Sequence, residues 1–260
     1  MEFFDVTYEV VDQVAEISLQ RPPVNALSLR MIRELVDALK KAAADPSVRA
    51  VIFASAIAKR FCVGLDINLI AGQSSDQIHD VLQGLYVDLY DAQYKLGKPS
   101  IAAVNGAARG GGMTVAVSCD VVLASESATF GYPEIELGLI PGIHFIHLPR
   151  IVGRHRAFEL LFSGRSFPAG EAATLGIVNE VVADDELMNR ARALARTFAA
   201  KPPSVMRLAR AAFMRANDLD YRRSIENVVD SFCTIAGTAA AREGIQAYIE
   251  KRPPNWRDDA

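Results

Sequence analysis

The sequence predicts an α/β fold that is followed by a helical C-terminal region. Strand and helix patterns alternate from Val14 to about Val182, as they do in layered α/β proteins. After the proline pair at 202–203, the apolar residues follow helical spacing alone. The chain has 260 residues, of which 50% are hydrophobic, so a sizeable core can form. We therefore expect an α/β core over residues 1–200 and a helical region over residues 201–260.

The first elements are a strand and an amphipathic helix. Ala15, Ile17 and Leu19 alternate with polar residues, which is typical of a half-buried strand. Ser28 is a residue type that caps helix N-termini, and Pro46 discourages a helix from continuing. Between them, apolar side chains recur at helical spacing, at Ile32, Leu35, Val36 and Leu39. We expect a helix that begins after Ser28 and ends near Pro46.

Three later runs are apolar throughout. They are "AVIFA" at 50–54, "IAAV" at 101–104 and "VVLA" at 121–124. Short unbroken runs of this kind fit strands that are covered on both faces, in a parallel or mixed sheet. The second run leads into "NGAARGGGMTVAVSCD", in which three consecutive glycines precede a small-residue stretch suited to a buried helix.

The C-terminal region contains two apolar stripes at helical spacing. One includes Val205, Leu208 and Phe213, and the other includes Ile225, Val229 and Phe232. Each stripe could cover the core of its own chain or a neighbouring subunit, and the sequence leaves both possibilities open.

Charge and composition favour a small-molecule partner. The net charge is −3 and both signs are scattered, so no broad basic surface is expected for nucleic acid or membranes. The N-terminus lacks a targeting pattern and no apolar run approaches membrane-spanning length, so we expect a soluble, cytoplasmic protein. Cys62, Cys119 and Cys233 lie far apart without metal-ligand spacing, and we expect buried thiols and no metal site.

The glycine run itself, Gly110 to Gly112, allows two interpretations. It matches neither a dinucleotide-binding fingerprint nor a phosphate loop, so it supports nucleotide binding poorly. It is either a tight turn from strand to helix or a place where a helix N-terminal amide faces a ligand oxygen. "KRFCVGLDI" offers a second donor of the same kind, because Gly64 permits close approach beside the Leu65 amide.

Several segments together carry a family resemblance. They are "RPPVNALS", "KRFCVGLDI", "KPSIAAVNGAARGGG" with "CDVVLASESATFGYPEIELGLIPG", "GRSFPAGEAATLGIVNEVV" and "GIQAYIEKRPPNW". Over nearly its whole length the chain resembles the crotonase, or enoyl-CoA hydratase/isomerase, superfamily. The resemblance implies a spiral of repeated ββα units and C-terminal helices that form a homotrimer or a dimer of trimers. It also implies an acyl-CoA thioester substrate, with coenzyme A entering as part of the substrate and no separate cofactor.

The resemblance further implies positions for substrate contacts. The backbone amides of Leu65 and Gly111 would hold the thioester oxygen, where an enolate develops negative charge. Val63 and Pro133 would contact the substrate beside them. The positions implied for the coenzyme A nucleotide are Lys59, Arg60 and Lys251.

The acid and base positions depart from the family hydratases, which usually carry two glutamates. The first position is Thr114, whereas the second is present as Glu134 in "YPEIELG". One carboxylate can take a proton from one carbon and return it to another, while water addition usually uses two. The pattern resembles that of the Δ3,Δ2-enoyl-CoA isomerases, with Glu134 as the single base. Glu136 is expected to be an exposed or structural acid.

A second departure is "PGIHFIHLPR", where the family commonly has a turn rich in glycine and threonine. His144 and His147 could face the acyl pocket, with His144 contacting substrate, or they could be packed polar groups. Thr114 could likewise contact substrate, or it could hydrogen-bond locally or pack on its helix. The isomerase reading is therefore accompanied by two alternatives. One is a hydratase or another acyl-CoA lyase or hydrolase, and the other is a non-catalytic acyl-CoA-binding subunit, against which Glu134 argues.

Overall fold

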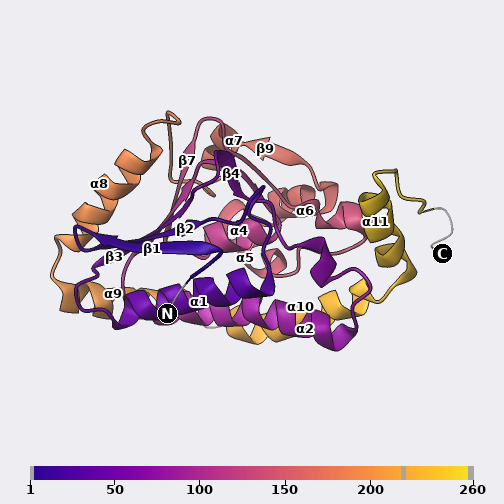
Figure 1. Cartoon of the computed structure of the whole chain (residues 1–260), viewed down its shortest axis with the longest axis horizontal. Coiled ribbons are helices and arrows are strands. Elements are labelled where there is room, and N and C mark those ends of the chain that lie inside the picture. The colour runs from indigo at the N-terminus through magenta and orange to yellow at the C-terminus, as the bar shows by residue number, and fades with distance from the viewer. Residues whose placement is uncertain (1–2, 218–220, 257–260) are drawn as a thin grey trace.

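The computed structural model describes residues 3–217 and 221–256, which form two sheets packed against helices (Figure 1). The larger sheet has six strands in the order β1-β2-β3-β5-β7-β10. Their bounds are Val6–Val11, Val14–Leu19, Ala50–Ser55, Ser100–Val104, Val121–Ser125 and Glu180–Val182. β1 and β2 form an antiparallel hairpin, and the other neighbours pair in parallel. The strands expected from alternation and from the three apolar runs are confirmed.

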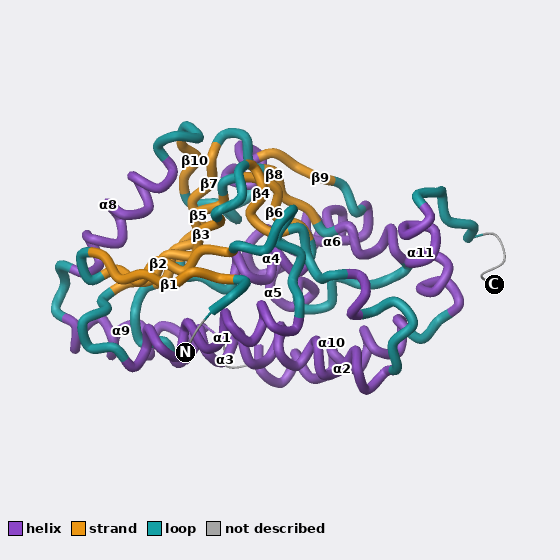
Figure 2. Tube along the Cα trace, viewed as in Figure 1, coloured by secondary structure: helices purple, strands orange, loops and turns teal. Residues whose placement is uncertain are grey.

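A second sheet of four strands, in the order β4-β6-β8-β9, lies beside the first (Figure 2). Its strands are Lys59–Cys62, Gly106–Arg109, Thr129–Gly131 and Ser166–Pro168. The chain alternates between the sheets, because β3, β5 and β7 lie in the larger sheet and β4, β6 and β8 follow in the smaller one. This repetition is the spiral of ββα units that the resemblance implies, and the fold class is confirmed.

The helix after β2 shows how local sequence sets the element bounds. α1 spans Leu29–Ala44, and the Ser28 hydroxyl accepts a hydrogen bond from the Met31 amide at 3.1 Å. Its apolar face is buried and it ends just before Pro46, as the sequence predicts. The remaining elements before residue 200 are η1 Ile67–Leu69, α2 Ser75–Leu82, η2 Gln83–Asp88, α3 Leu89–Lys95, α4 Gly111–Val117, η3 Pro133–Leu137, α5 His144–Val152, α6 Arg154–Ser163, α7 Ala169–Thr174 and α8 Leu187–Ala199.

The buried helix α4 lies unusually close to the end of β4. A Cβ on Gly112 would lie 2.0 Å from the Cys62 carbonyl oxygen, so no larger residue fits there without moving the backbone. Gly110, directly before the helix, has a φ of +48°, which favours glycine. The glycine run therefore serves a strand-to-helix turn at which two backbone segments nearly touch. The three cysteines are free and buried, as expected.

The C-terminal helices divide into an inward-facing and an outward-facing group. α10, Tyr221–Ala236, buries Ile225, Val229 and Phe232 in the core of its own chain. By contrast, α9, Pro203–Asn217, leaves Val205 60% exposed and Leu208 65% exposed. The last helix, α11, spans Ala239–Glu250 and packs on η3. One apolar stripe thus covers the chain's own core, while the other is left facing solvent.

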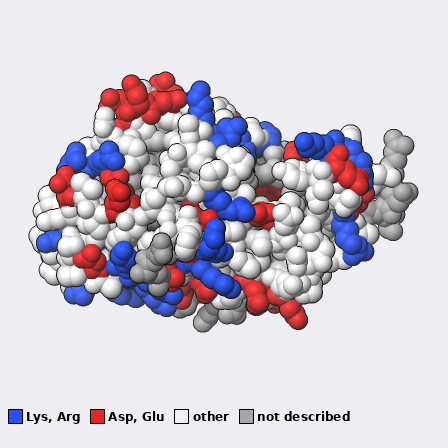
Figure 3. All heavy atoms as spheres, in the orientation of Figure 1, with Lys and Arg blue, Asp and Glu red and all other residues white. Residues whose placement is uncertain are grey.

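Charged side chains of both signs are interspersed on the face shown in Figure 3. In the part of the chain that the structure describes, no helix is both long and apolar enough to cross a membrane.

We expect the exposed stripe of α9 to be buried in a closed homo-oligomer, because contiguous apolar patches of this kind mark association surfaces. Val205→Asp combined with Leu208→Asp should shift the protein toward the monomer, since two carboxylates would be buried without partners. Sedimentation velocity at micromolar concentration checks this. Val11→Asp, at an exposed position on β1, is the matched control and should leave the mass unchanged. A wild-type protein that sediments as a monomer would contradict the expectation.

Candidate active site

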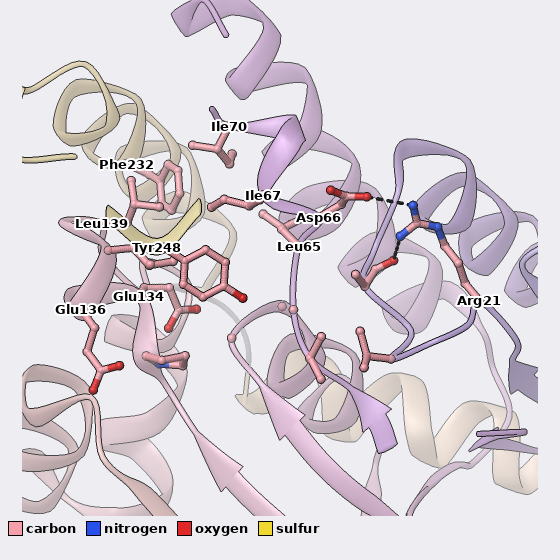
Figure 4. Close-up of a pocket in the computed structure, with 18 of the residues that line it drawn as sticks. Arg21, Leu65, Asp66, Ile67, Ile70, Glu134, Glu136, Leu139, Phe232 and Tyr248 are labelled. Carbon is pink, nitrogen blue, oxygen red and sulfur yellow. Dashed lines mark hydrogen bonds and ion pairs between the residues drawn. The ribbon is translucent and has the colours of Figure 1, made fainter. Parts of the chain in front are cut away.

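A cavity of 430 Å³ lies where several separate parts of the chain meet (Figure 4). The segment 63–66 between β4 and η1 forms one wall together with the start of η1, and the start of α4 forms another. η3 forms a third wall, and α10 and α11 contribute Phe232 and Tyr248. The walls are largely apolar, which is typical of a small-molecule site with a few placed polar groups.

Two backbone amides meet at this cavity. The strand-like bridge between Leu27 and Leu65 uses the Gly64 carbonyl and the Asp66 amide, so the Leu65 amide points to the opposite side. Gly111 is the first residue of α4, where amides have no carbonyl partner within the helix. A Cβ on Gly111 would lie 3.4 Å from the Leu65 nitrogen, so the two amides are close together. Their arrangement suits an oxygen that gains negative charge.

Glu134 places a carboxyl group beside these amides. It is the second residue of η3, which starts at Pro133, and a Cβ on Gly110 would lie 2.7 Å from its Oε1. Its Oε2 is shielded from solvent and has no hydrogen-bond partner in the described chain. Burial raises the pKa of Glu134 to about 7, against a smaller opposite effect of its own backbone amide. A carboxyl group with this pKa can both accept and return a proton near neutral pH.

Two other carboxylates line the cavity but are engaged or turned away. Asp66 forms an ion pair with Arg21, with 2.8 Å between Oδ2 and Nη2. Burial acts to raise the pKa of Asp66, but hydrogen bonds from Arg21 and Asn68 lower it overall. Figure 4 shows the Glu136 side chain pointing away from Glu134. Among the carboxylates that line the cavity, Glu134 is thus the one placed at the paired amides.

Thr114 and His144, the two other positions considered for substrate contact, lie outside the walls of the Glu134 cavity. Both line a second cavity of 190 Å³, together with His147. Thr114 Oγ1 lies 3.3 Å from His144 Nε2, one turn of α4 below Gly111. Burial, reinforced by His147, lowers the pKa of His144 to about 3, against a smaller opposite effect of the Gly110 carbonyl. Burial and Arg150 lower the pKa of His147 to about 4. Both rings are therefore neutral near pH 7.

The other sequence-predicted residues fall into two groups. Val63 and Pro133 line the cavity of Glu134. Lys59, Arg60 and Lys251 are exposed and lie outside the walls of both cavities. The structure therefore does not bring the three cations to the catalytic pocket itself.

Sequence reasoning missed several wall residues. Arg21 and Asp66 are 45 positions apart, and no local pattern links them, although Asp66 lies in the quoted segment "KRFCVGLDI". Tyr248 reaches the cavity from α11, the helix that packs on η3 (Figure 4). Little in the sequence indicates this role. Tyr248 lies in the segment "GIQAYIEKRPPNW", which carries part of the resemblance, but the resemblance implies no aromatic contact there.

Many named proteins are similar in sequence to this chain. The sequence model of the Enoyl-CoA hydratase/isomerase family matches residues 9–259. A probable enoyl-CoA hydratase of Bacillus subtilis is 34% identical over 252 residues, which cover 96% of this chain and 97% of the relative. The short-chain-enoyl-CoA hydratase of Clostridium acetobutylicum is 34% identical over 261 residues, with 97% of each chain covered.

Solved structures agree with the sequence comparison. An enoyl-CoA hydratase from Mycobacterium avium subsp. paratuberculosis superposes with a TM-score of 0.88 at 26% identity, covering 99% of this chain and 100% of the other. The human mitochondrial delta3-delta2-enoyl-CoA isomerase superposes with a TM-score of 0.87 at 28% identity, covering 95% and 98%. Fold, sequence and the full length of the match together show that this chain is an enzyme of the enoyl-CoA hydratase/isomerase family.

Proposed function

We propose that this enzyme shifts a double bond, converting a 3-enoyl-CoA thioester into the 2-enoyl-CoA thioester, with Glu134 as the single general base. The observation that carries the proposal is the shielded, unpartnered carboxyl group of Glu134 beside the amides of Leu65 and Gly111. The raised pKa of Glu134 supports it, because the same group must take up a proton and release it again.

The first step removes a proton from the carbon between the thioester and the double bond. The Glu134 carboxylate accepts this proton, and the electron pair moves onto the thioester oxygen to form a dienolate. The Leu65 and Gly111 amides donate hydrogen bonds to that oxygen. Preorganised donors of this kind are worth about 3–4 kcal/mol each when the site excludes water.

In the second step, Glu134 returns its proton to the far carbon of the former double bond. The electron pair moves back, the thioester carbonyl re-forms, and the double bond now lies next to it. The proton that leaves the first carbon is returned to the far carbon, and no water is added. One carboxyl group is therefore enough for the whole reaction. Val63 and Pro133 would hold the acyl group between the amides and the carboxylate.

The coenzyme A part of the substrate extends out of the cavity. We propose that Lys59, Arg60 and Lys251 contact its phosphates from outside, where a mobile cation near several phosphates is favourable. These three cations are exposed, so their contribution should depend on ionic strength.

Hydration of a 2-enoyl-CoA thioester is the second candidate, because the named relatives include hydratases. It would require a second group to hold the attacking water beside Glu134. Glu136 points away from Glu134, and Thr114 contacts His144 in the neighbouring cavity. The geometry therefore favours the double-bond shift.

Glu134→Gln should lower isomerisation of a 3-enoyl-CoA by about 10²–10⁴-fold, because the amide cannot accept the proton. Binding of the thioester should change little, since the two backbone amides remain. Purified protein is offered 3-enoyl-CoA and 2-enoyl-CoA separately, and isomerised and hydrated products are followed by chromatography. Glu9→Gln, at an exposed position on β1, is the matched control. Efficient hydration of 2-enoyl-CoA by the wild type, or full isomerase activity of the Gln variant, would overturn the proposal.

The pKa of about 7 at Glu134 also predicts two pH dependences. The isomerase kcat/KM should fall about tenfold per pH unit below 7, as the base becomes protonated, and level off above it. Stability changes in the opposite direction, because the folded-state pKa lies above the ordinary 4.5. Between pH 4.5 and about 7 the carboxyl group is ionised in the unfolded chain but still protonated in the folded protein, so the wild type should lose stability as pH rises through this window.

Glu134→Gln removes that ionisation. Denaturant unfolding should therefore show the Gln variant gaining up to about 3 kcal/mol over the wild type across this pH window, with no further change outside it. A difference that does not vary with pH would show that the carboxyl group is not buried in the way described.

A further inference from the structure

The second cavity contains polar chemistry that the proposed reaction does not use. His144 is 1% exposed, and its Nε2 faces Thr114 Oγ1. The Nδ1 atoms of His144 and His147 are buried, and neither has a hydrogen-bond partner of acceptable geometry in the described part of the chain. A buried nitrogen without a partner costs free energy, so these atoms are available to hydrogen-bond a water molecule or a ligand that enters the cavity.

The two cavities adjoin at the side chain of Leu85. Gly111 lines the cavity of Glu134, and Leu85 lines the second cavity. A Cβ on Gly111 would lie 3.2 Å from Leu85 Cδ2, so these residues are in contact. Leu85 belongs to η2, a π-helical segment, and its neighbour Tyr86 lines the first cavity. Short π-helical segments often mark functional positions in helices.

This arrangement leaves the Leu85 side chain between the Gly111 amide and the second cavity. A thioester oxygen held at the Gly111 amide places the start of the acyl chain against Leu85. If the Leu85 side chain turns aside, the chain continues into the second cavity and ends near the two histidines. The 190 Å³ available there suits a short chain end and little more.

The lining of the second cavity specifies the chemistry of that chain end. Neither lysine nor arginine is among its described wall residues, and the one wall carboxylate, Asp120, already pairs with Arg210 at 2.9 Å, so these walls offer a carboxylate chain end no cation of its own. Burial keeps both histidines neutral near pH 7. A neutral imidazole offers one donor and one acceptor nitrogen, which a hydroxyl can match in either tautomer. Leu89 and Ile143 supply apolar wall for the methylene groups before it.

We propose that the second cavity receives the far end of the acyl group, and that His144 and His147 select acyl-CoA thioesters whose chain ends in a neutral hydrogen-bonding oxygen. A hydroxyl or a ketone meets this description. The inference rests on the proposed function in one respect, because it starts from a thioester oxygen held by Leu65 and Gly111. Leu85 then determines when the acyl chain can pass.

The test measures binding of saturated acyl-CoA thioesters to the wild-type protein by calorimetry. These probes can be neither isomerised nor hydrated, so the result does not depend on which reaction occurs. Each chain length is offered in a methyl-ended form and in a form with a terminal hydroxyl. At the length that reaches the histidines, the hydroxyl form should bind about tenfold more tightly. Equal or tighter binding of the methyl form at every length would overturn the inference.

A variant assigns the preference to its residue. His144→Phe keeps a planar ring and removes both nitrogens, so the hydroxyl preference should fall to about twofold or less. His79→Phe, on the exposed side of α2, is the matched control and should retain the preference. Retention of the full preference by folded His144→Phe would contradict the assignment. If that variant does not fold, His147→Phe provides the same comparison and the wild-type result still decides.

The outcomes separate this inference from the proposed reaction. A hydroxyl preference without isomerase activity would support the second cavity and overturn the double-bond shift. Isomerase activity without the hydroxyl preference would support the double-bond shift and overturn the inference about the second cavity. Failure of every thioester to bind would overturn both.

Discussion

The near-contact between the start of α4 and the end of β4 is the constraint on which the site depends. Gly112 leaves room for the Cys62 carbonyl, and Gly110 turns the chain with a positive φ while leaving room for Glu134. Gly111 between them brings its amide close to the Leu65 nitrogen. Each glycine thus removes a different steric obstacle, and together they bring two backbone segments from different ββα units to one point. A side chain at any of the three would separate the amides, the carboxyl group or the sheet from one another.

The same packing raises the free energy of an ionised carboxyl group at this point, and this makes the group suitable for proton transfer. Glu134 lies in a mainly apolar cavity without a partner for Oε2, so water does not stabilise its ionised form. Asp66, at the same cavity, has Arg21 as a partner and a lowered pKa. Two carboxyl groups in one pocket thus have opposite pKa shifts because one is paired and the other is isolated. This contrast separates a proton-transfer group from a structural ion pair.

Much of the fold could be predicted from local sequence. The Ser28 cap, the apolar runs and the glycine turn depend on residues that are neighbours along the chain, and the structure confirms those elements. The local patterns did not predict the strands of the smaller sheet, because these strands have three or four residues and contain glycine, proline and charged side chains. Such strands are specified by pairing between distant segments rather than by their own pattern.

The candidate site could be predicted only in part, for a related reason. The resemblance marks Leu65, Gly111 and Glu134, and the structure brings them to one cavity. Leu85, on a π-helical turn, contacts Gly111 and lines the second cavity, and no sequence period specifies the direction of its side chain. Thr114 and His144 are 30 positions apart in the sequence, so their contact could not be predicted from spacing. Both lie with Leu85 in the wall of the second cavity.

The packing of α11 on η3 has a consequence for how the protein is made. A Cβ on Gly244 would lie 2.4 Å from the Leu137 carbonyl oxygen, so the last helix lies directly on the turn that carries Glu134. Phe232 and Tyr248 complete the cavity from the last two helices. During synthesis the sheets emerge from the ribosome first, and the walls of the pocket remain unfinished until the final helix has left the exit tunnel. A nascent chain that still lacks α11 therefore has no complete pocket, because Tyr248 and the cover over η3 are missing.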